Sequence, residues 1–428
     1  MRNLRRIRDL TSLAVVSAVA LGVVACGGAS TSTPEPTVPG KAPVSAHGEK
    51  IRDVSVQAKK EHIQALDEFV KHEAAADWAE ASCRDVAGKF VQASDQQKGD
   101  SGKALPTALY NAGVAYMRCG LTADAVEQFK ASTTADGAFH RGRAQVALFE
   151  YQKSKNLDAA ISALEGIIRD AKFQNVEALV SVAALQMERN GAEANSDGAN
   201  DLERAKKNIQ RALAIDDAYM PAFNQLAIYY MESAKGKSGA GRGRSSGLVV
   251  AGSARKRVNQ QQLELATLVA SQAIAKNPNY APIHNTAGLI QVQSDNFNGA
   301  VKSFAKARSL DKKFYEAHMN YSAVNLSFRG FKEAKGSYAD ALQLRPNDYE
   351  AHLGLALAYR GLIDDANWDE YLAGAQTNLD ACKKLDAARP EAYYNEAILT
   401  QEYRSKGSGD TSKTIEVLRQ AITQYETF

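Results

Sequence analysis

Beyond residue 50 the chain consists of short runs in which apolar and small residues recur every three or four positions. The segment 106–139 is an example, with Tyr110, Gly113, Ala125 and Phe129 at such intervals. This spacing is typical of an amphipathic helix. Only six prolines follow residue 50, and Ala, Leu, Tyr, Glu and Lys dominate there. We therefore predict an all-α fold for this part of the chain.

The same pattern repeats with a period of 34 residues. Segment 315–348 can be aligned with the 34 residues before it. The alignment pairs His284 with His318, Ala300 with Ala334, Phe304 with Tyr338, and Ala307 with Ala341. A further shift of 34 residues brings His352, Ala356 and Tyr359 into corresponding places. A period of this length indicates a solenoid, in which each helical unit packs against its neighbours.

These positions resemble the tetratricopeptide (TPR) repeat, which has a small residue at position 8, an aromatic at 11, Ala at 20 and 27, and a bulky residue at 24. Small residues let two antiparallel helices approach closely, while large ones fill the gap to the next hairpin. The resemblance implies a right-handed solenoid of antiparallel helix hairpins over residues 106–428. Residues 51–105 are expected to form one or two longer capping helices. About eight units begin at Pro106, Arg141, Val176, Pro221, Ala281, Tyr315, Tyr349 and Pro390.

Several of these units have enlarged turns, and the longest is the basic insert 234–258 in the fourth unit. Its sequence suggests a P-loop, but Met231, inside a helix, stands where the first glycine would be needed. A G-x-S-x-G match at 243–247 lacks the parallel sheet that this motif requires. Two interpretations remain open: a disordered surface loop, or a docking loop for a partner or an anionic polymer. The basic residues are Lys235, Lys237, Arg242, Arg244, Arg255, Lys256 and Arg257.

The first 25 residues have the features of an export signal. Four arginines precede a short apolar run, and Val23-Val24-Ala25 leads directly into Cys26. This ending resembles the lipobox of bacterial lipoproteins, which implies that Cys26 is acylated. Acyl chains hold a folded domain on a membrane. Because Gly27 follows Cys26 where an Asp would retain the protein at the inner membrane, we expect an outer-membrane lipoprotein facing the periplasm.

Residues 26–50 contain four of the ten prolines and few large apolar side chains, so we expect an extended tether. The leader carries four Arg and one Asp, a net charge of +3, which accounts for the +3 of the whole chain. The mature chain is therefore close to neutral, and neither nucleic acid nor an anionic membrane is expected as its main partner.

Three further cysteines, Cys83, Cys119 and Cys382, would lie in an oxidising compartment after export. Sequence does not decide their pairing. Two alternatives remain open. Either Cys83 and Cys119, the two nearest along the chain, form a disulfide, or all three cysteines are buried free thiols.

No constellation in the sequence indicates catalysis. His284, His318 and His352 are one repeat apart, roughly 10 Å in a solenoid, which is too far for a shared metal. His72-Glu73 begins an H-E-x-x-H string, but Ala76 replaces its second histidine. We expect no enzyme activity, cofactor, metal or small-molecule substrate.

In the TPR family a partner binds the concave face, which the first helix of each hairpin lines. By this resemblance, the partner-binding face is mostly apolar, as suits a partner helix with periodic anchors. It would comprise Tyr110, Val114, Met117, Asn224, Ile228, Met231, Asn285, Leu289, Val292, Met319, Leu326, Leu353, Leu357 and Arg360.

Leader, tether and repeat body together resemble the TPR lipoproteins of the myxobacterial adventurous gliding-motility apparatus (GltE-like proteins). This resemblance implies a non-catalytic scaffold that binds other envelope proteins of a motility complex. The alternative is a pilotin-like factor that assists assembly of a type IV pilus secretin.

Overall fold

The structure is a computed structural model that describes residues 53–427, apart from residues 76, 196, 236–258 and 407–409. The leader, the tether and the predicted lipidation site Cys26 lie outside the described residues. Of the basic insert only Lys235 is described among its charged residues, and it forms an ion pair with Glu232 at the end of its helix. The other six basic residues lie outside: Lys237, Arg242, Arg244, Arg255, Lys256 and Arg257.

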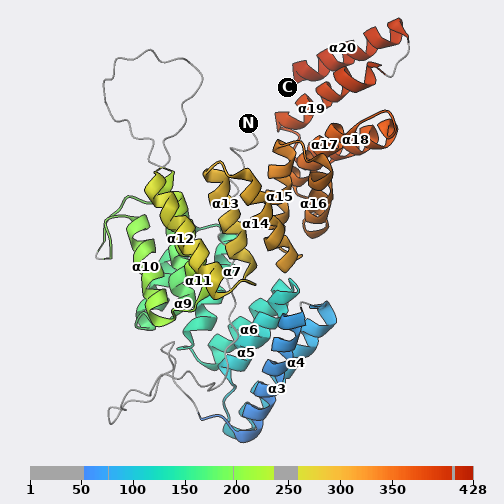
Figure 1. Cartoon of the computed structure of the whole chain (residues 1–428). Coiled ribbons are helices and arrows are strands. Elements are labelled where there is room, and N and C mark those ends of the chain that lie inside the picture. The colour runs from blue at the N-terminus through green and yellow to red at the C-terminus, as the bar shows by residue number, and fades with distance from the viewer. Residues whose placement is uncertain (1–52, 76, 196, 236–258, 407–409, 428) are drawn as a thin grey trace, which may run out of the picture. The chain divides into compact units, whose positions relative to one another are not determined.

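The described residues form an all-α TPR solenoid with no strand, which confirms the predicted fold class (Figure 1). In chain order the helices are α3 (Val56–Ala75), α4 (Glu80–Ser101), α5 (Pro106–Arg118), α6 (Thr122–Ala135), α7 (His140–Ser154), α8 (Leu157–Asp170), α9 (Val176–Arg189), α10 (Asp201–Ile215), α11 (Met220–Ala234), α12 (Gln260–Lys276), α13 (Ala281–Gln293), α14 (Phe297–Leu310), α15 (Tyr315–Ser327), α16 (Phe331–Leu344), α17 (Tyr349–Leu362), α18 (Trp368–Leu385), α19 (Pro390–Leu399), the π-helical η1 (Thr400–Arg404) and α20 (Thr411–Thr427).

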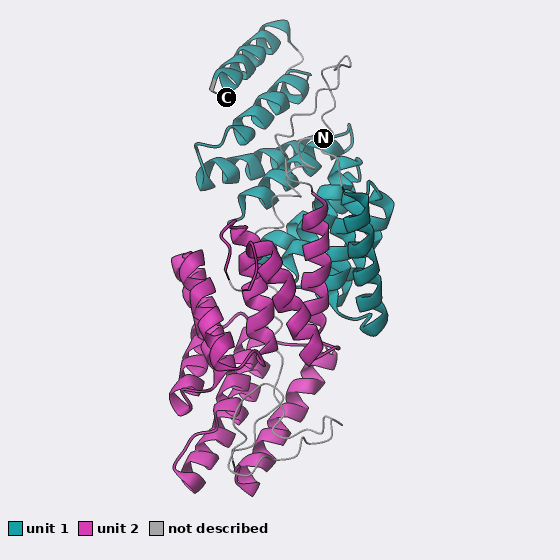
Figure 2. Cartoon of the chain, turned by 90° about the vertical axis from the view of Figure 1, so that its left-hand side faces the viewer, with its two compact units in different colours: residues 1–14, 236–428 teal, residues 15–235 magenta. Residues whose placement is uncertain are grey.

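The helices fall into two compact units (Figure 2). We call described residues 53–235 the N-terminal unit and described residues 259–427 the C-terminal unit. The division falls within the basic insert, so the fourth predicted repeat has α11 in one unit and α12 in the other.

Local sequence explains where the helices begin. An asparagine precedes α8, α9, α10, α12 and α14, and in each case its side chain accepts a hydrogen bond from a backbone N–H of the first turn. Such a cap satisfies one of the donors that a helix start leaves free. Proline occupies the first turn of α5, α11, α13 and α19, where a missing N–H costs nothing.

The core is built from the repeated small and bulky positions. The position-24 residues Phe129, Phe304 and Tyr338 are at most 4% exposed. Tyr338 fills the gap between successive hairpins: a β-carbon at Gly354 of the next first helix would lie 2.2 Å from the Tyr338 ring. Close backbone approach at a glycine therefore lets a large ring join two repeats.

The enlarged turn of the third repeat is held in place by one carboxylate. Asp201, at the start of α10, accepts hydrogen bonds from Arg189 Nε at 2.7 Å and from the backbone N–H of Gly191 at 2.7 Å, and it also pairs with Arg204. Burial acts to raise the pKa of Asp201, but these hydrogen bonds outweigh it and lower the pKa to about 2. Arg204 in turn donates to the carbonyl oxygen of Glu193 inside the turn, at 2.7 Å.

A disulfide joins Cys83 of α4 to Cys119 at the end of α5, 36 positions further along the chain. This is one of the two alternatives that the sequence left open. Cys382 of α18 is a buried free thiol.

No helix in the described part of the chain is both long and apolar enough to cross a membrane.

Candidate functional site

The structure corrects the predicted partner-binding face. Eight of the fourteen predicted residues are buried, so they belong to the core and offer no surface to a partner. The residues concerned are Tyr110, Val114, Asn224, Met231, Asn285, Val292, Met319 and Leu353.

Tyr110 shows why a first-helix position becomes core. Its hydroxyl donates a 2.7 Å hydrogen bond to Glu177 of α9, and Glu177 also pairs with Arg141 of α7. The Arg141 guanidinium lies over the Tyr110 ring, 4.7 Å from its centroid. Burial, and then the charge of Glu177, raise the pKa of Tyr110 well above its usual value, which keeps the hydroxyl protonated as a donor. First helices of three successive repeats are thus joined by buried polar contacts.

The remaining six predicted residues are partly exposed: Met117 and Ile228 in the N-terminal unit, and Leu289, Leu326, Leu357 and Arg360 in the C-terminal unit. Leu289, Leu326 and Leu357 lie one on each of α13, α15 and α17, which contact one another in that order. We call these three leucines the inner row. Leu289 and Leu326 pack against buried clusters of the core, so one side of each side chain is held in place while the other remains accessible to solvent.

Arg360 lies on α17, three residues after Leu357, at the C-terminal end of the inner row. Its guanidinium donates a 2.8 Å hydrogen bond to Asn395 Oδ1 of α19. Burial lowers the pKa of Arg360, and no carboxylate among the described residues forms an ion pair with it. By contrast, Arg345 and Arg389 pair with Glu316 and Glu350. Arg360 therefore places a positive charge beside an apolar row.

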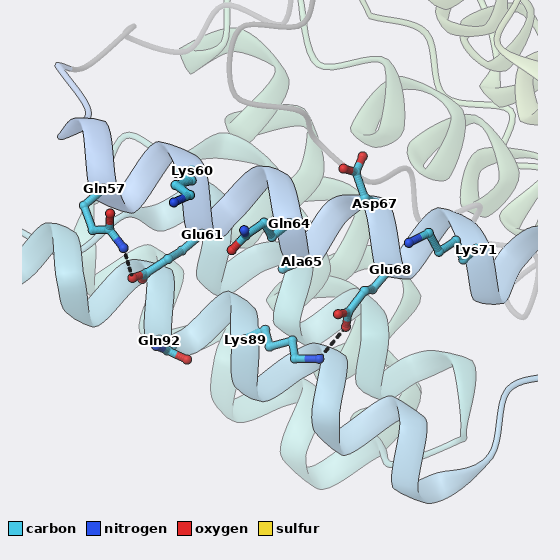
Figure 3. A pocket seen from close by; sticks show the side chains of 10 residues that line it. All are labelled: Gln57, Lys60, Glu61, Gln64, Ala65, Asp67, Glu68, Lys71, Lys89 and Gln92. Atoms are coloured by element: carbon cyan, nitrogen blue, oxygen red, sulfur yellow. Dashed lines mark hydrogen bonds and ion pairs between the residues drawn. The ribbon is translucent and has the colours of Figure 1, made fainter.

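A groove with a volume of about 500 Å³ lies between α3 and α4. Its walls are polar, and several of its side chains contact one another (Figure 3). Gln57 donates to Glu61 at 2.7 Å, and Lys89 pairs with Glu68 at 2.5 Å. A surface of paired polar groups gives an apolar partner little to bind.

The repeated histidines have a structural part in the C-terminal unit. Nε2 of His284, His318 and His352 lies 2.8, 3.0 and 3.0 Å from the carbonyl oxygen six residues earlier in the chain. A carbonyl oxygen only accepts, so each Nε2 carries a hydrogen and donates it. Each histidine thus ties the start of one repeat to the turn before it.

Among the described residues, no three His, Cys, Asp or Glu side chains are grouped so as to hold a metal ion. Burial raises the pKa of the Cys382 thiol to about 12, so it is protonated and a poor nucleophile at neutral pH.

Sequence reasoning missed the contacts of Arg141, Glu177 and Asp201. Each is a charged residue near the beginning of a helix whose other face is small or apolar. Charged side chains there are ordinarily solvated. The sequence gives no sign that Arg141 pairs with Glu177, 36 positions away, or that Asp201 pairs with Arg189, 12 positions away.

No protein-family model and no curated protein matches the chain. Among solved structures, a thermophilic TPR protein of Thermus thermophilus, TTC0263, is 22% identical, with a TM-score of 0.40, over 51% of this chain and 98% of its own. PilF of Pseudomonas aeruginosa is 17% identical, with a TM-score of 0.41, over 61% and 98%. A TPR protein of Parabacteroides merdae is 14% identical, with a TM-score of 0.36, over 66% and 98%. At these identities the likeness concerns the fold alone.

Proposed function

We propose that this protein is a non-catalytic scaffold, anchored by a lipid on Cys26 at the periplasmic face of the outer membrane, that binds other envelope proteins through its TPR body. By its resemblance to the motility lipoproteins, the assembly it serves is a gliding-motility complex. The lipobox-like ending before Cys26 supports the anchor. A disulfide between Cys83 and Cys119 suits an exported protein, because such bonds persist in oxidising compartments.

The inner row is the observation that carries the binding function. One leucine lies on each of three successive first helices, Leu289 and Leu357 at position 9 and Leu326 at position 12. Leu289 and Leu326 also pack against buried clusters while part of each side chain stays accessible. A partner helix that lies across α13, α15 and α17 would meet one apolar anchor per repeat. Arg360 at the end of the row would favour an acidic residue at that end of the partner helix.

Capture from native membranes tests the proposal. The intact lipoprotein is isolated as the wild type, as the double variant Leu326→Glu/Leu357→Glu, and as Leu385→Glu. Leu385 lies on α18, is 39% exposed and stands outside the inner row, so it controls for an added charge on an exposed leucine. We expect the wild type and Leu385→Glu to retain the same envelope proteins and the double variant to lose them. Equal retention by all three would refute the role of the inner row.

The identity of the retained proteins also distinguishes between the two candidate assemblies. Motility-complex subunits support the proposed scaffold, whereas secretin subunits would indicate the pilotin-like alternative.

The anchor is tested separately by Cys26→Ala and by labelling with palmitate. We expect the wild type to incorporate label and sediment with outer membranes, and Cys26→Ala to do neither. Membrane association without label would contradict a lipid anchor.

A further inference from the structure

α7 joins two buried clusters of the N-terminal unit. The first cluster contains Phe129, and the second contains Leu179. Side chains of α7 contribute to both, because Phe149 packs against the first cluster and Leu148 belongs to the second. α7 therefore connects the repeat before it with the repeats that follow.

The start of α7 is packed closely against α5 and α6. Gly142 lies so near α6 that a β-carbon on it would stand 2.2 Å from Ser132 Oγ. The ring centroid of Phe139, the residue directly before α7, lies 5.8 Å from that of Tyr110 on α5. A displacement at this point therefore alters the packing against both neighbouring helices.

His140, the first residue of α7, is poorly placed to carry a positive charge. The residue is 7% exposed, and its Nδ1 is buried with no hydrogen-bond partner in the part of the chain that the structure describes. The helix dipole places positive partial charge at this end of α7. The next residue, Arg141, already places a buried cation there, paired with Glu177 of α9. Protonation of His140 would add a second buried cation without an acceptor at Nδ1.

Three further charged groups act on His140. Arg143 lies on the same turn of α7, Asp170 on α8 and Asp136 in the turn before α7. Arg143 and Asp170 pair with each other at 2.9 Å. Burial, and then the charge of Arg143, lower the pKa of His140 below its ordinary value of 6.5, although Asp170 and Asp136 act in the opposite direction.

We propose that the start of α7 is an acid-sensitive joint, at which protonation of His140 loosens α7 from α5 and α6 and uncouples the two buried clusters. The neutral ring is the form that fits the closely packed joint. This inference concerns the N-terminal unit alone, so it stands or fails independently of the inner row and of the proposed function.

The direction of the pH effect follows from linkage. Because the pKa of His140 is lowered in the folded chain, the unfolded chain binds the proton more readily. Stability is therefore fully present above the ordinary value of 6.5 and is lost as the pH falls through the lower pKa of the folded state.

Urea unfolding at about pH 7.5 and about pH 5.5 tests the joint. The parent chain carries Cys26→Ala to prevent acylation and Trp368→Phe, so that the fluorescence of Trp78, which packs against the first cluster, reports on the N-terminal unit. Its transition should move to lower urea at the lower pH. His140→Gln removes the titrating group and should show a smaller shift. The absence of a shift in the parent chain, or an equal shift in both chains, would overturn the proposal.

Two substitutions that break the same ion pair separate the effect of charge from that of packing. Arg143→Gln removes a cation near His140 and should lessen the acid shift, whereas Asp170→Asn removes a carboxylate that favours protonation and should enlarge it. The two side chains are 33% and 54% exposed, so both variants should fold. Equal acid shifts in the two variants would contradict a role for the charge on His140.

Hydrogen exchange locates the opening. For each chain, exchange at about pH 5.5 is compared with exchange at about pH 7.5 after correction for the intrinsic rates. Amides at the start of α7 should lose more protection in the parent chain than in His140→Gln, whereas α15 and α17 of the C-terminal unit should behave alike in both. Equal losses at α7 in the two chains would refute the joint.

Discussion

The ring of Phe129 lies directly against Gly113, so close that a β-carbon on this glycine would stand 2.6 Å from Phe129 Cε1. The fifth repeat reproduces the contact: a β-carbon at Gly288 would lie 2.5 Å from Phe304 Cε1. In both hairpins position 8 of the first helix meets position 24 of the second. The repeat signature therefore describes one physical contact, in which a missing side chain makes room for a buried ring.

Gly113→Ala should destabilise the N-terminal unit. Phe129 is fully buried and has little space to shift, so the added methyl overpacks the hairpin by about 1–3 kcal/mol, which exceeds the usual gain of replacing a helical glycine. Urea unfolding measures the change. Gly88→Ala on α4 is the control, because a β-carbon there meets nothing within 4 Å, and it should stabilise by up to about 1 kcal/mol. Stabilisation by both substitutions would refute the tight contact.

Asp201→Asn should destabilise the third repeat by about 3 kcal/mol, because it leaves Arg204 buried and Arg189 half-buried without their carboxylate. The control, Asp158→Asn, removes another partner of Arg189, but its side chain is 80% exposed, so the loss should stay below about 1 kcal/mol. Thermal unfolding of both variants compares them. Equal losses would show that the turn does not depend on Asp201.

Asp201 also predicts a pH dependence. Its pKa in the folded state, about 2, lies below its ordinary value of 3.8, so the unfolded chain binds the proton more readily. The stabilisation is therefore fully present above the unfolded pKa and is lost as the pH falls through the folded pKa. Unfolding free energies of wild type and Asp201→Asn should begin to approach each other below about pH 4 and converge only below about pH 2. A difference that persists there would contradict the assignment.

Loss of the disulfide should weaken the N-terminal unit alone. Removing a cross-link between Cys83 and Cys119 costs about 2–5 kcal/mol, chiefly by freeing the unfolded chain. The chain has two tryptophans, Trp78 in the N-terminal unit and Trp368 in the C-terminal unit. Cys119→Ser is introduced into two single-tryptophan chains, and tryptophan fluorescence follows their unfolding in urea. In the Trp368→Phe chain, where Trp78 reports on the N-terminal unit, the substitution should move the unfolding transition to a lower urea concentration. In the Trp78→Phe chain, where Trp368 reports on the C-terminal unit, the transition should not move, and a shift in both chains would refute a local effect.

Cys382 should be unreactive in the folded protein. Burial raises its thiol pKa to about 12, so at pH 8 almost no thiolate is present, and only the thiolate attacks alkylating reagents. In a Cys26→Ala chain, iodoacetamide should label nothing before denaturation and one cysteine after it. Addition of a reductant to the denatured chain should raise the count to three. Labelling of the native chain would contradict the buried, protonated thiol.

Much of the fold could be predicted from sequence, because the information is local and repeated. Residues such as Ala125, Phe129 and Gly113 recur at fixed spacing, and that spacing specifies both the helix period and the face that packs. The helix starts follow likewise from single capping residues such as Asn156 and Asn296.

The candidate site could be predicted only in part. Its helices were correctly assigned, and Leu326 and Leu357 are partly exposed as expected of a binding surface. Tyr110 and Leu353 are buried, although they too lie on first helices at positions that the TPR family uses for partner binding. Exposure depends on how closely the next first helix approaches, and spacing within one helix carries no measure of that distance.

The sequence by itself determined the all-α repeat, the period of its hairpins and the residues that let helices touch, since these are properties of neighbouring positions. Tertiary structure alone decided that Cys83 forms a disulfide with Cys119, that Asp201 pairs with both Arg189 and Arg204, and that Tyr110 is buried. Each of these depends on distances between helices that are remote in the chain. Such distances result from the sum of all packing contacts and cannot be read from any single segment.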